Sequence, residues 1–396
     1  MRTATAFAVA ILLSGTAHAA TIAVEAGDDA QERLQAALIE AARGDTVQIG
    51  AGRFALTDGL SLDVDRVTVR GAGPGETILD FSGQLGAGEG LLVTSDDVVL
   101  RDFAVENPRG DGIKSRRADR IVYHNLRVEW TGGPAATNGA YGLYPVESED
   151  VLVDGCTVIG ASDAGIYVGQ SDRIVVRNNS VRHNVAGIEI ENSFNADVHH
   201  NTATQNTGGV LVFDLPNLPQ MGGHGVRVFA NTIRDNNTPN FAPEGNIVAT
   251  VPAGTGVIVM ANRDVRVFDN DIGEHGTSNV MLISYPQSFD DASYDPSPRN
   301  VVVSGNRHGR AGYAPGRPGM AEMAAAMGGT LPPVMWDGTG EGIAVLDAVP
   351  VLSLGLTRAG QPVDEAQPSL AQFEAAPPAA ELPRVTLPAS MEAAIR

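Results

Sequence analysis

The sequence predicts an all-β chain folded as a single-stranded right-handed parallel β-helix, a solenoid with an N-terminal capping helix and an irregular C-terminal cap and tail. From about residue 60, three short apolar strands recur with a period near 22 residues, and asparagine recurs at one corner of successive repeats. The 46 glycines and the low aromatic content of 5% also suit a turn-rich β protein.

The first nineteen residues are typical of a secretory signal peptide. Arg2 precedes an apolar run over residues 4–13, and a small-x-small cleavage site occupies residues 17–19. This run is too short to span a membrane, and no later apolar stretch is long enough to do so. We therefore expect residues 1–19 to be removed, leaving a periplasmic or secreted protein without a membrane span.

Charge and cysteine content narrow the class of protein. The formal net charge of −20 argues against nucleic acid as a partner, because a phosphate backbone repels an acidic surface. The single cysteine, Cys156, excludes an internal disulfide. Stability must therefore come from packing and from backbone hydrogen bonds.

Residues 20–58 are predicted to form an N-terminal cap and the first coil. Asp28 or Asp29 is a suitable N-cap for a helix, Gly44 is a suitable C-cap, and a short strand follows at residues 46–49. Because a solenoid exposes its core at an open end, a single amphipathic helix there is best explained as a cap. Its apolar face would comprise Leu34, Ala37, Leu38 and Ala41.

Residues 59–311 are predicted to form the β-helix. An inward asparagine at a corner can bond both the backbone and the asparagine of the next coil. Apolar side chains take the same position in the earlier coils, so we expect Cys156 to be buried and unreactive. In order, the corner residues are Ala72, Phe103, Leu126, Cys156, Asn179, Asn201, Asn231, Asn270 and Asn306.

Residues 312–396 are predicted to form a C-terminal cap and an extended tail, with one strand-like run at 343–354. Before them, long insertions interrupt the coils on either side of the glycine-led strand. Loops on one face of a solenoid usually form its binding wall. The insertions before that strand are 131–140 and 235–254, and those after it are 214–224 and 285–299.

The glycine-led strands define the candidate binding face. Because side chains alternate along a strand, the residue between two inward apolar residues points out of the coil. The face then changes from basic to aromatic, acidic and apolar, and aromatic rings beside charges suit sugar rings. Its first outward row is Lys114, Tyr144, Tyr167, Glu189 and Leu211, and its second is Arg116, Val146, Gly169, Glu191 and Phe213.

Lys114 is the only lysine among 27 basic residues. Lysine loses its proton more readily than arginine, so Lys114 is a candidate catalytic base, with Arg116 neutralising a developing charge. The alternative is a plain solvated charge. Six basic residues between positions 109 and 127 form either a patch for uronate or sulfate groups or an ordinary solvated coil edge.

Glu189 and Glu191 lie two positions apart on one strand, and Asp163 and Asp214 lie in adjacent turns. Paired carboxylates can perform acid–base chemistry or bind Ca²⁺, which makes calcium the one candidate cofactor. The alternative is exposed charge that maintains solubility. No histidine has the spacing to serine or cysteine of a hydrolytic triad.

Together, the asparagine corners, the helical cap and the glycine-led strands resemble the pectin-lyase-like superfamily, which includes pectate lyases and alginate C5-epimerases. The likeness covers roughly residues 25–310. It extends to an exported bacterial β-helix repeat family of unassigned function, through stretches such as VEWTGG at 128–133 and NGAYGLYPV at 138–146. This resemblance implies an exported c-type cytochrome as a partner.

The stretch YGLYPV at 141–146 is similar to the epimerase motif Tyr-Gly-Phe/Ile-Asp-Pro-His. Tyr141 matches the catalytic tyrosine of that family, whereas Tyr144 and Val146 replace its aspartate and histidine. Lys114, one coil earlier, stands where epimerases place a lysine. The resemblance therefore implies the fold and the groove, but not alginate epimerisation as such.

We expect an exported protein that binds or modifies a polysaccharide, and that is lyase- or epimerase-like on a uronate-type glycan if it is an enzyme. Lys114 or Tyr141 would remove the proton, and Arg116 would neutralise the charge. The alternative is a non-catalytic envelope scaffold or binding module that partners an exported c-type cytochrome. The expected substrate contacts are Tyr144, Tyr167, Glu189, Glu191 and Asp214.

Overall fold

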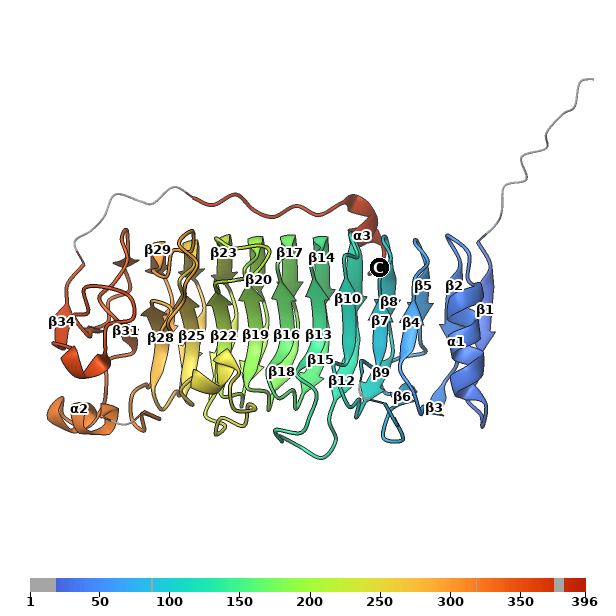
Figure 1. The fold of residues 1–396 in the computed structure, drawn as a ribbon, viewed down its shortest axis with the longest axis horizontal. Helices are drawn as coiled ribbons and strands as arrows, with labels where there is room; N and C mark the ends of the chain where they lie inside the picture. The colour runs from blue at the N-terminus through green and yellow to red at the C-terminus, as the bar shows by residue number, and fades with distance from the viewer. Residues whose placement is uncertain (1–18, 87, 318, 374–380) are drawn as a thin grey trace, which may run out of the picture.

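The chain forms one elongated rod built from three long β-sheets (Figure 1). The computed structural model describes residues 19–86, 88–317, 319–373 and 381–396. The predicted signal peptide, apart from its last residue, lies outside the described residues. Successive coils pair strand by strand in parallel, which confirms the predicted parallel β-helix. None of the helices in the described ranges is long and apolar enough to cross a membrane.

Sheet A runs along the whole rod and pairs its strands in parallel. Its central strands are six residues long, whereas those near the N-terminal end have three or four. In order it contains β1 (Thr21–Val24), β2 (Thr46–Ile49), β5 (Thr68–Arg70), β8 (Val99–Arg101), β11 (Ile121–His124), β14 (Glu149–Asp154), β17 (Asp172–Arg177), β20 (Phe194–His199), β23 (His224–Phe229), β26 (Arg263–Phe268), β29 (Arg299–Ser304) and β32 (Ala344–Val345).

Sheet C contains the glycine-led strands and is parallel except at its last pair, where β34 is antiparallel to β33. In order it contains β4 (Leu60–Leu62), β7 (Leu91–Val93), β10 (Ile113–Arg116), β13 (Tyr141–Val146), β16 (Ala164–Gly169), β19 (Ala186–Glu191), β22 (Gly208–Phe213), β25 (Thr255–Met260), β28 (Ser278–Ile283), β31 (Val334–Trp336), β33 (Val351–Ser353) and β34 (Ser369–Ala371).

Sheet B closes each coil with short strands, mostly of three residues. A coil therefore passes from sheet C to sheet A and then to sheet B. In order, sheet B contains β3 (Gly52–Ala55), β6 (Thr77–Asp80), β9 (Ala104–Glu106), β12 (Arg127–Glu129), β15 (Thr157–Ile159), β18 (Ser180–Arg182), β21 (Thr202–Thr204), β24 (Thr232–Arg234), β27 (Asp271–Gly273) and β30 (Arg307–His308).

Stacked apolar side chains fill the interior of the rod. Ile166, Ile188, Val210 and Val257 are successive register partners in sheet C, and each is fully buried. β-branched side chains fit this position because they pack well on a pleated surface. The same alternation sends the intervening side chains to the outer face of sheet C.

The helix α1 (Ala30–Glu40) covers the N-terminal end of the rod. Its buried side chains include Leu34 and Leu38, and it contacts β1, β3 and β4. Asp29 occupies the N-cap position, but its carboxylate pairs with Arg33 at 2.7 Å and does not cap the helix. Burial of the apolar face therefore holds α1 in place.

The asparagines predicted at the corner between sheets A and B form a continuous ladder. The backbone N and Nδ2 of Asn179 both donate to Oδ1 of Asn201, at 3.0 and 2.9 Å, and Nδ2 also donates to the carbonyl of Val153. The last rung, Asn306, donates in the same way to the carboxylate of Asp347. Cys156 lies at the same corner, is buried, and has a pKa raised to about 12 by that burial. The pattern repeats from Asn201 to Asn231, from Asn231 to Asn270 and from Asn270 to Asn306.

A second ladder, which the sequence analysis missed, lies at the corner between sheets B and C. Asn184 donates twice to Asn206, and Asn206 donates twice to Asn236. The next rung is His275, whose Nε2 lies 3.2 Å from Nδ2 of Asn236. Burial lowers the pKa of His275 to about 4, so its ring is neutral and accepts that amide.

The parallel pairing continues beyond residue 311, where the sequence predicted only a cap. β31 and β33 add to sheet C, and β32 adds to sheet A. The predicted run at 343–354 is two strands in different sheets, because the chain turns between them at residues 346–350. Asp347 in this turn accepts the last rung of the ladder and so anchors the turn to the rod.

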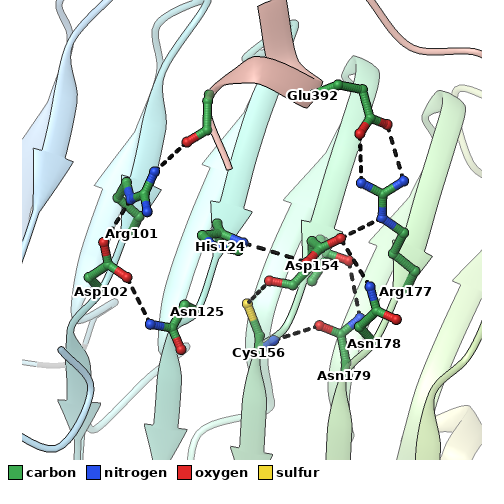
Figure 2. A network of polar contacts seen from close by, with 12 residues as sticks. Arg101, Asp102, His124, Asn125, Asp154, Cys156, Arg177, Asn178, Asn179 and Glu392 are labelled. Atoms are coloured by element: carbon green, nitrogen blue, oxygen red, sulfur yellow. Dashed lines mark hydrogen bonds and ion pairs between the residues drawn. The ribbon is translucent and has the colours of Figure 1, made fainter. Parts of the chain in front are cut away.

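The end of the chain, predicted as an extended tail, returns to the N-terminal half of the rod and packs against it. The helix α3 (Ala389–Ala393) lies on the outer face of sheet A (Figure 2). Leu387 and Met391 are buried there. Their apolar partners on sheet A are Val122, Leu152 and Val175.

Polar contacts fix the same segment on sheet A. Arg177 donates to both carboxylate oxygens of Glu392, at 2.8 and 3.1 Å, and also pairs with Asp154 (Figure 2). Arg101 donates to the carbonyl of Ala394. We refer to residues 381–396 as the strap.

Candidate functional site

The outer face of sheet C has the order of side chains that the sequence predicted. Lys114 and Tyr144 are register partners in β10 and β13. Tyr167 pairs with Glu189, and Glu189 pairs with Leu211, in the strands that follow. The face therefore changes from basic to aromatic, acidic and apolar along the rod.

Lys114 lies at the start of this face and is partly exposed. Its Nζ is 3.2 Å from Oε1 of Glu89, 3.7 Å from Oδ2 of Asp111 and 4.6 Å from the ring centroid of Tyr144. The ammonium therefore joins two carboxylates to an aromatic face. The predicted role of Lys114 as a base would require these contacts to break first.

Three tyrosines form a compact cluster beside Lys114. The ring centroid of Tyr141 is 4.5 Å from that of Tyr144 and 4.5 Å from that of Tyr167, and Tyr144 packs edge-on against Tyr167 at 5.0 Å. Tyr141 and Tyr144 are partly exposed, whereas Tyr167 is buried. Burial raises the pKa of Tyr141 well above its ordinary value, so its phenol is a proton donor at neutral pH.

Arg116 and Arg117 lie at the edge of the face and share one carboxylate. Nη2 of Arg116 is 3.0 Å from Oε1 of Glu147, and Nε of Arg117 is 2.6 Å from Oε2. Both arginine side chains are more than half exposed, so the trio has an excess positive charge at the surface. They line a surface cavity of about 540 Å³ whose lining also includes three further carboxylates, those of Asp119, Glu149 and Asp172.

The acidic half of the face is covered, although the sequence analysis expected it to be open. Tyr167, Glu189, Glu191 and Asp214 are all buried, and the most exposed of them, Glu191, is only 6% exposed. A chain lying on this face would touch Tyr144 and none of these four. The cover consists of apolar side chains from the three later insertions, among them Leu215, Met221, Phe241, Val248, Val251, Tyr285 and Tyr294.

Polar contacts attach the cover to the sheet. The hydroxyl of Tyr294 donates to the carbonyl of Asp214 at 2.6 Å, and the Asp214 carboxylate accepts the backbone N–H groups of Gly222 and Gly223. Asn246 donates to Oδ2 of Asp163 at 3.3 Å. The insertions predicted to wall the face therefore close over its acidic part.

The buried carboxyls beneath this cover have strongly perturbed acidities. Burial raises the pKa of Asp163 to about 7, and the charge of Glu191 adds to that shift. Burial also raises the pKa of Glu191 to about 7, although the Tyr167 hydroxyl, which donates to Glu191 at 2.6 Å, opposes the shift. Neither oxygen of Glu189 has a hydrogen-bond partner among the described residues, and burial raises its pKa well above the usual range.

Asp111 is the site residue that the sequence analysis missed. Its Oδ1 accepts the backbone N–H of Tyr141 at 3.2 Å, and burial raises its pKa to about 6 against the opposing effect of Lys114. The available signal was its position three residues before Lys114, within the Gly110–Gly112 turn that precedes β10. It is a partly exposed carboxyl that titrates near neutrality.

The calcium hypothesis concerned Glu189 and Glu191. In the described ranges, no group of three or more histidine, cysteine, aspartate or glutamate side chains is arranged to hold a metal ion. Asp163, Glu189 and Glu191 are all buried beneath the cover and raise one another's pKa values electrostatically.

Comparison with known proteins agrees with this architecture. A family model described as "Right handed beta helix region" matches residues 64–219. The chain therefore has the right-handed β-helix fold. A sequence comparison with curated proteins finds no match to this β-helix chain.

Solved β-helix structures match most of the chain at low identity. The A-module of the Azotobacter vinelandii mannuronan C-5 epimerase AlgE4 has a TM-score of 0.53 and 14% identity, covering 86% of this chain and 98% of that one. The AlgE6 A-module from the same organism has a TM-score of 0.50 and 16% identity, covering 85% and 98%. At these identities the likeness establishes the β-helix fold alone.

Proposed function

We propose that this protein binds a polysaccharide along the open part of the outer face of sheet C, around Lys114, Tyr141 and Tyr144. The observation that carries the proposal is the pair of partly exposed tyrosines, with ring centroids 4.5 Å apart and ring planes tilted by 51°, and an ammonium over the ring of Tyr144. Aromatic faces cover the apolar face of a sugar ring, and neighbouring charges bind its hydroxyl or carboxylate groups. The two mannuronan C-5 epimerase modules, which share the fold, support a glycan as the ligand.

We propose a uronate-type glycan in particular. Arg116 and Arg117 place two guanidinium groups beside a single carboxylate, so one positive charge is available to a substrate at the edge of the face. Arginine binds carboxylates in a bidentate geometry. Asp119, Glu149 and Asp172 line the same cavity, so the uronate proposal rests on bidentate pairing with Arg116 or Arg117 and not on a positive local field.

The binding proposal is tested by titrating uronate oligomers and neutral oligosaccharides of equal length into the full chain by calorimetry. Replacing Tyr144 with alanine should weaken uronate binding at least tenfold, whereas Tyr144→Phe should retain most of it. Tyr313→Ala is a matched control, because Tyr313 also has a cation over its ring but lies outside the face. This cation is the guanidinium of Arg310, whose Cζ is 4.0 Å from the ring centroid. Unchanged affinity in Tyr144→Ala, or an equal loss in the control, would contradict the proposal.

A catalytic version is favoured by the position of Asp111, whose carboxylate lies 3.7 Å from Nζ of Lys114 and accepts the backbone N–H of Tyr141. Burial there raises the pKa of Asp111 to about 6. A carboxyl that titrates near neutrality is suited to exchange a proton with a substrate. In a lyase reaction, a base takes the proton next to the uronate carboxylate, the C4–O bond breaks, and the leaving sugar oxygen takes up a proton. Here Asp111 would be the base, Arg116 would neutralise the carboxylate, and the Tyr141 phenol would supply the second proton.

New ultraviolet absorbance from an unsaturated uronate tests this catalytic version. Activity that falls more than a hundredfold in Asp111→Asn, with binding retained, would establish it. Binding without any product across the uronate panel would leave a non-catalytic binding module. Copurification of a protein such as a c-type cytochrome from the native host, with no retained glycan, would favour the scaffold alternative.

A further inference from the structure

A second cavity, of about 800 Å³, lies at the C-terminal end of sheet C and includes none of the candidate-site residues. β28 and β31 form one side of it, and α2 (Met320–Ala326) forms another. Residues 354–368, which lead out of β33, close the third side. The volume falls within the range of sites that bury a small organic molecule.

Thioethers dominate the lining of this cavity. Met281 and Met335 are register partners in β28 and β31, so their side chains leave the same face of the sheet. Met320 and Met323 lie one turn apart on α2 and line the opposite side. Because methionine is unbranched and polarisable, such a lining adapts to a flexible apolar guest. Trp336 adds a large aromatic surface to the same lining.

The charged side chains of the lining are one cation, Arg317, and two carboxylates, Asp337 and Asp364. Arg317 is exposed and lines the cavity, and within the described residues its partner is the carbonyl of Thr250, with no carboxylate in ion-pair distance. Asp337, the buried carboxylate of the lining, is fully occupied, because one oxygen accepts from Ser284 and the other from Thr339. Asp364 faces solvent at the cavity and forms no ion pair with Arg317 in the described structure.

We propose that this cavity binds a small amphipathic acid, namely an acyl chain with a terminal carboxylate. The chain lies among the four thioethers and the indole of Trp336, and the carboxylate pairs with Arg317 at the mouth. This ligand differs in chemistry from the polysaccharide proposed for the open face, so each proposal can be tested independently of the other. Because the described partner of Arg317 is a carbonyl, its guanidinium can also pair with a carboxylate headgroup, a contact that a neutral headgroup lacks.

The test measures the binding of dodecanoate to the full chain by calorimetry and by Trp336 fluorescence, with dodecanoate kept below its micelle concentration. Dodecanoate should bind with one site per chain. Dodecyltrimethylammonium, which has the same chain length and the opposite charge, should bind at least tenfold more weakly. Arg317→Gln should weaken dodecanoate binding at least tenfold, whereas the exposed arginine of Arg358→Gln, outside the lining, should leave it unchanged.

A filling variant locates the ligand within the cavity. Met323→Trp places a larger side chain on α2 and should abolish dodecanoate binding, while circular dichroism shows the fold intact. The proposal is overturned by the absence of saturable dodecanoate binding, by equal affinity for the cationic amphiphile, or by full binding in Met323→Trp. Each of these outcomes is independent of uronate binding at Tyr144.

Discussion

The N-terminal and C-terminal halves of the rod differ both inside and outside. At Phe103, Leu126 and Cys156 the corner between sheets A and B is filled by apolar side chains, whereas Ala72, predicted at the same corner, is exposed. In this half the outer face of sheet C is open at Lys114 and Tyr144. From Asn179 onward the corner is a hydrogen-bonded ladder, and loops bury the same face. The candidate binding site lies where the half with the apolar corner and the open face meets the half with the ladder and the covered face.

The ladder half is also the half with the longest interruptions between rungs. Asn179 and Asn201 are 22 residues apart, whereas Asn231 and Asn270 are 39 residues apart, yet the hydrogen bonds between them are the same. Buried amides with fixed partners hold each coil in register, whatever loop leaves it. A polar corner therefore allows long insertions, and the insertions in turn cover the face.

The largest expected effect comes from breaking the ladder. Asn201→Ala would remove the acceptor of the Asn179 backbone N–H and Nδ2 and the donor to the carbonyl of Val176, which should lower the free energy of unfolding by about 3 kcal/mol. Cys156→Ala, at the same corner in the apolar half, should cost only about 1 kcal/mol, because it removes one small buried atom. Urea unfolding of both variants measures the difference, and equal losses would show that the two kinds of corner are equivalent.

An intermediate effect should follow from the acids beneath the cover. Because the folded-state pKa of Glu191 is raised to about 7, its contribution to stability is fully present below its unfolded pKa near 4.5 and is lost as pH rises towards 7. Glu191→Gln keeps an oxygen that can accept the Tyr167 hydroxyl but has no charge to bury. It should therefore raise the free energy of unfolding by about 2 kcal/mol at pH 8 and hardly change it at pH 4.

Measuring urea midpoints at both pH values checks this expectation. Glu147→Gln is the control, because Glu147 lies on the open half beside Arg116 and Arg117, which hold its pKa below the usual range. Its effect at pH 8 should therefore be slightly destabilising. A Glu191→Gln variant that gains nothing at pH 8 would show that the cover opens to hydrate the carboxyls.

The corner ladder was predictable because its asparagines recur at matching positions of successive coils. The second ladder was equally accessible, since Asn184, Asn206 and Asn236 each follow a first-ladder asparagine by five residues. His275 follows Asn270 by the same five residues, but its residue type does not mark it as a rung, because a histidine takes that place only when burial keeps it neutral.

The state of Glu189 and Glu191 was not predictable in the same way. Strand alternation places a side chain inside or outside the coil, and it placed these two correctly outside. Whether the outer face of sheet C is exposed to solvent depends on how the later insertions fold over it. The alternation of side chains along a strand does not predict the fold of those insertions. The strap is a similar case, because Leu387 and Met391 find apolar partners more than two hundred residues earlier in the chain.

The smallest expected effect concerns that strap, which adds a cover to sheet A in the half whose sheet C face is open. Glu392→Gln removes the charge that pairs with Arg177, and because Glu392 is 38% exposed the cost should be about 0.5 kcal/mol. Burial of Leu387 and Met391 remains, so the strap should stay bound but open more often.

Limited proteolysis within residues 381–396 should be about twofold faster in the variant, and high salt should produce the same change in the wild type. Glu40→Gln, at the exposed end of α1, should leave the rate unchanged. If Glu392→Gln is cleaved at the wild-type rate, apolar contacts alone hold the strap on sheet A. The strap would then cover sheet A as firmly as the insertions cover the acidic half of sheet C.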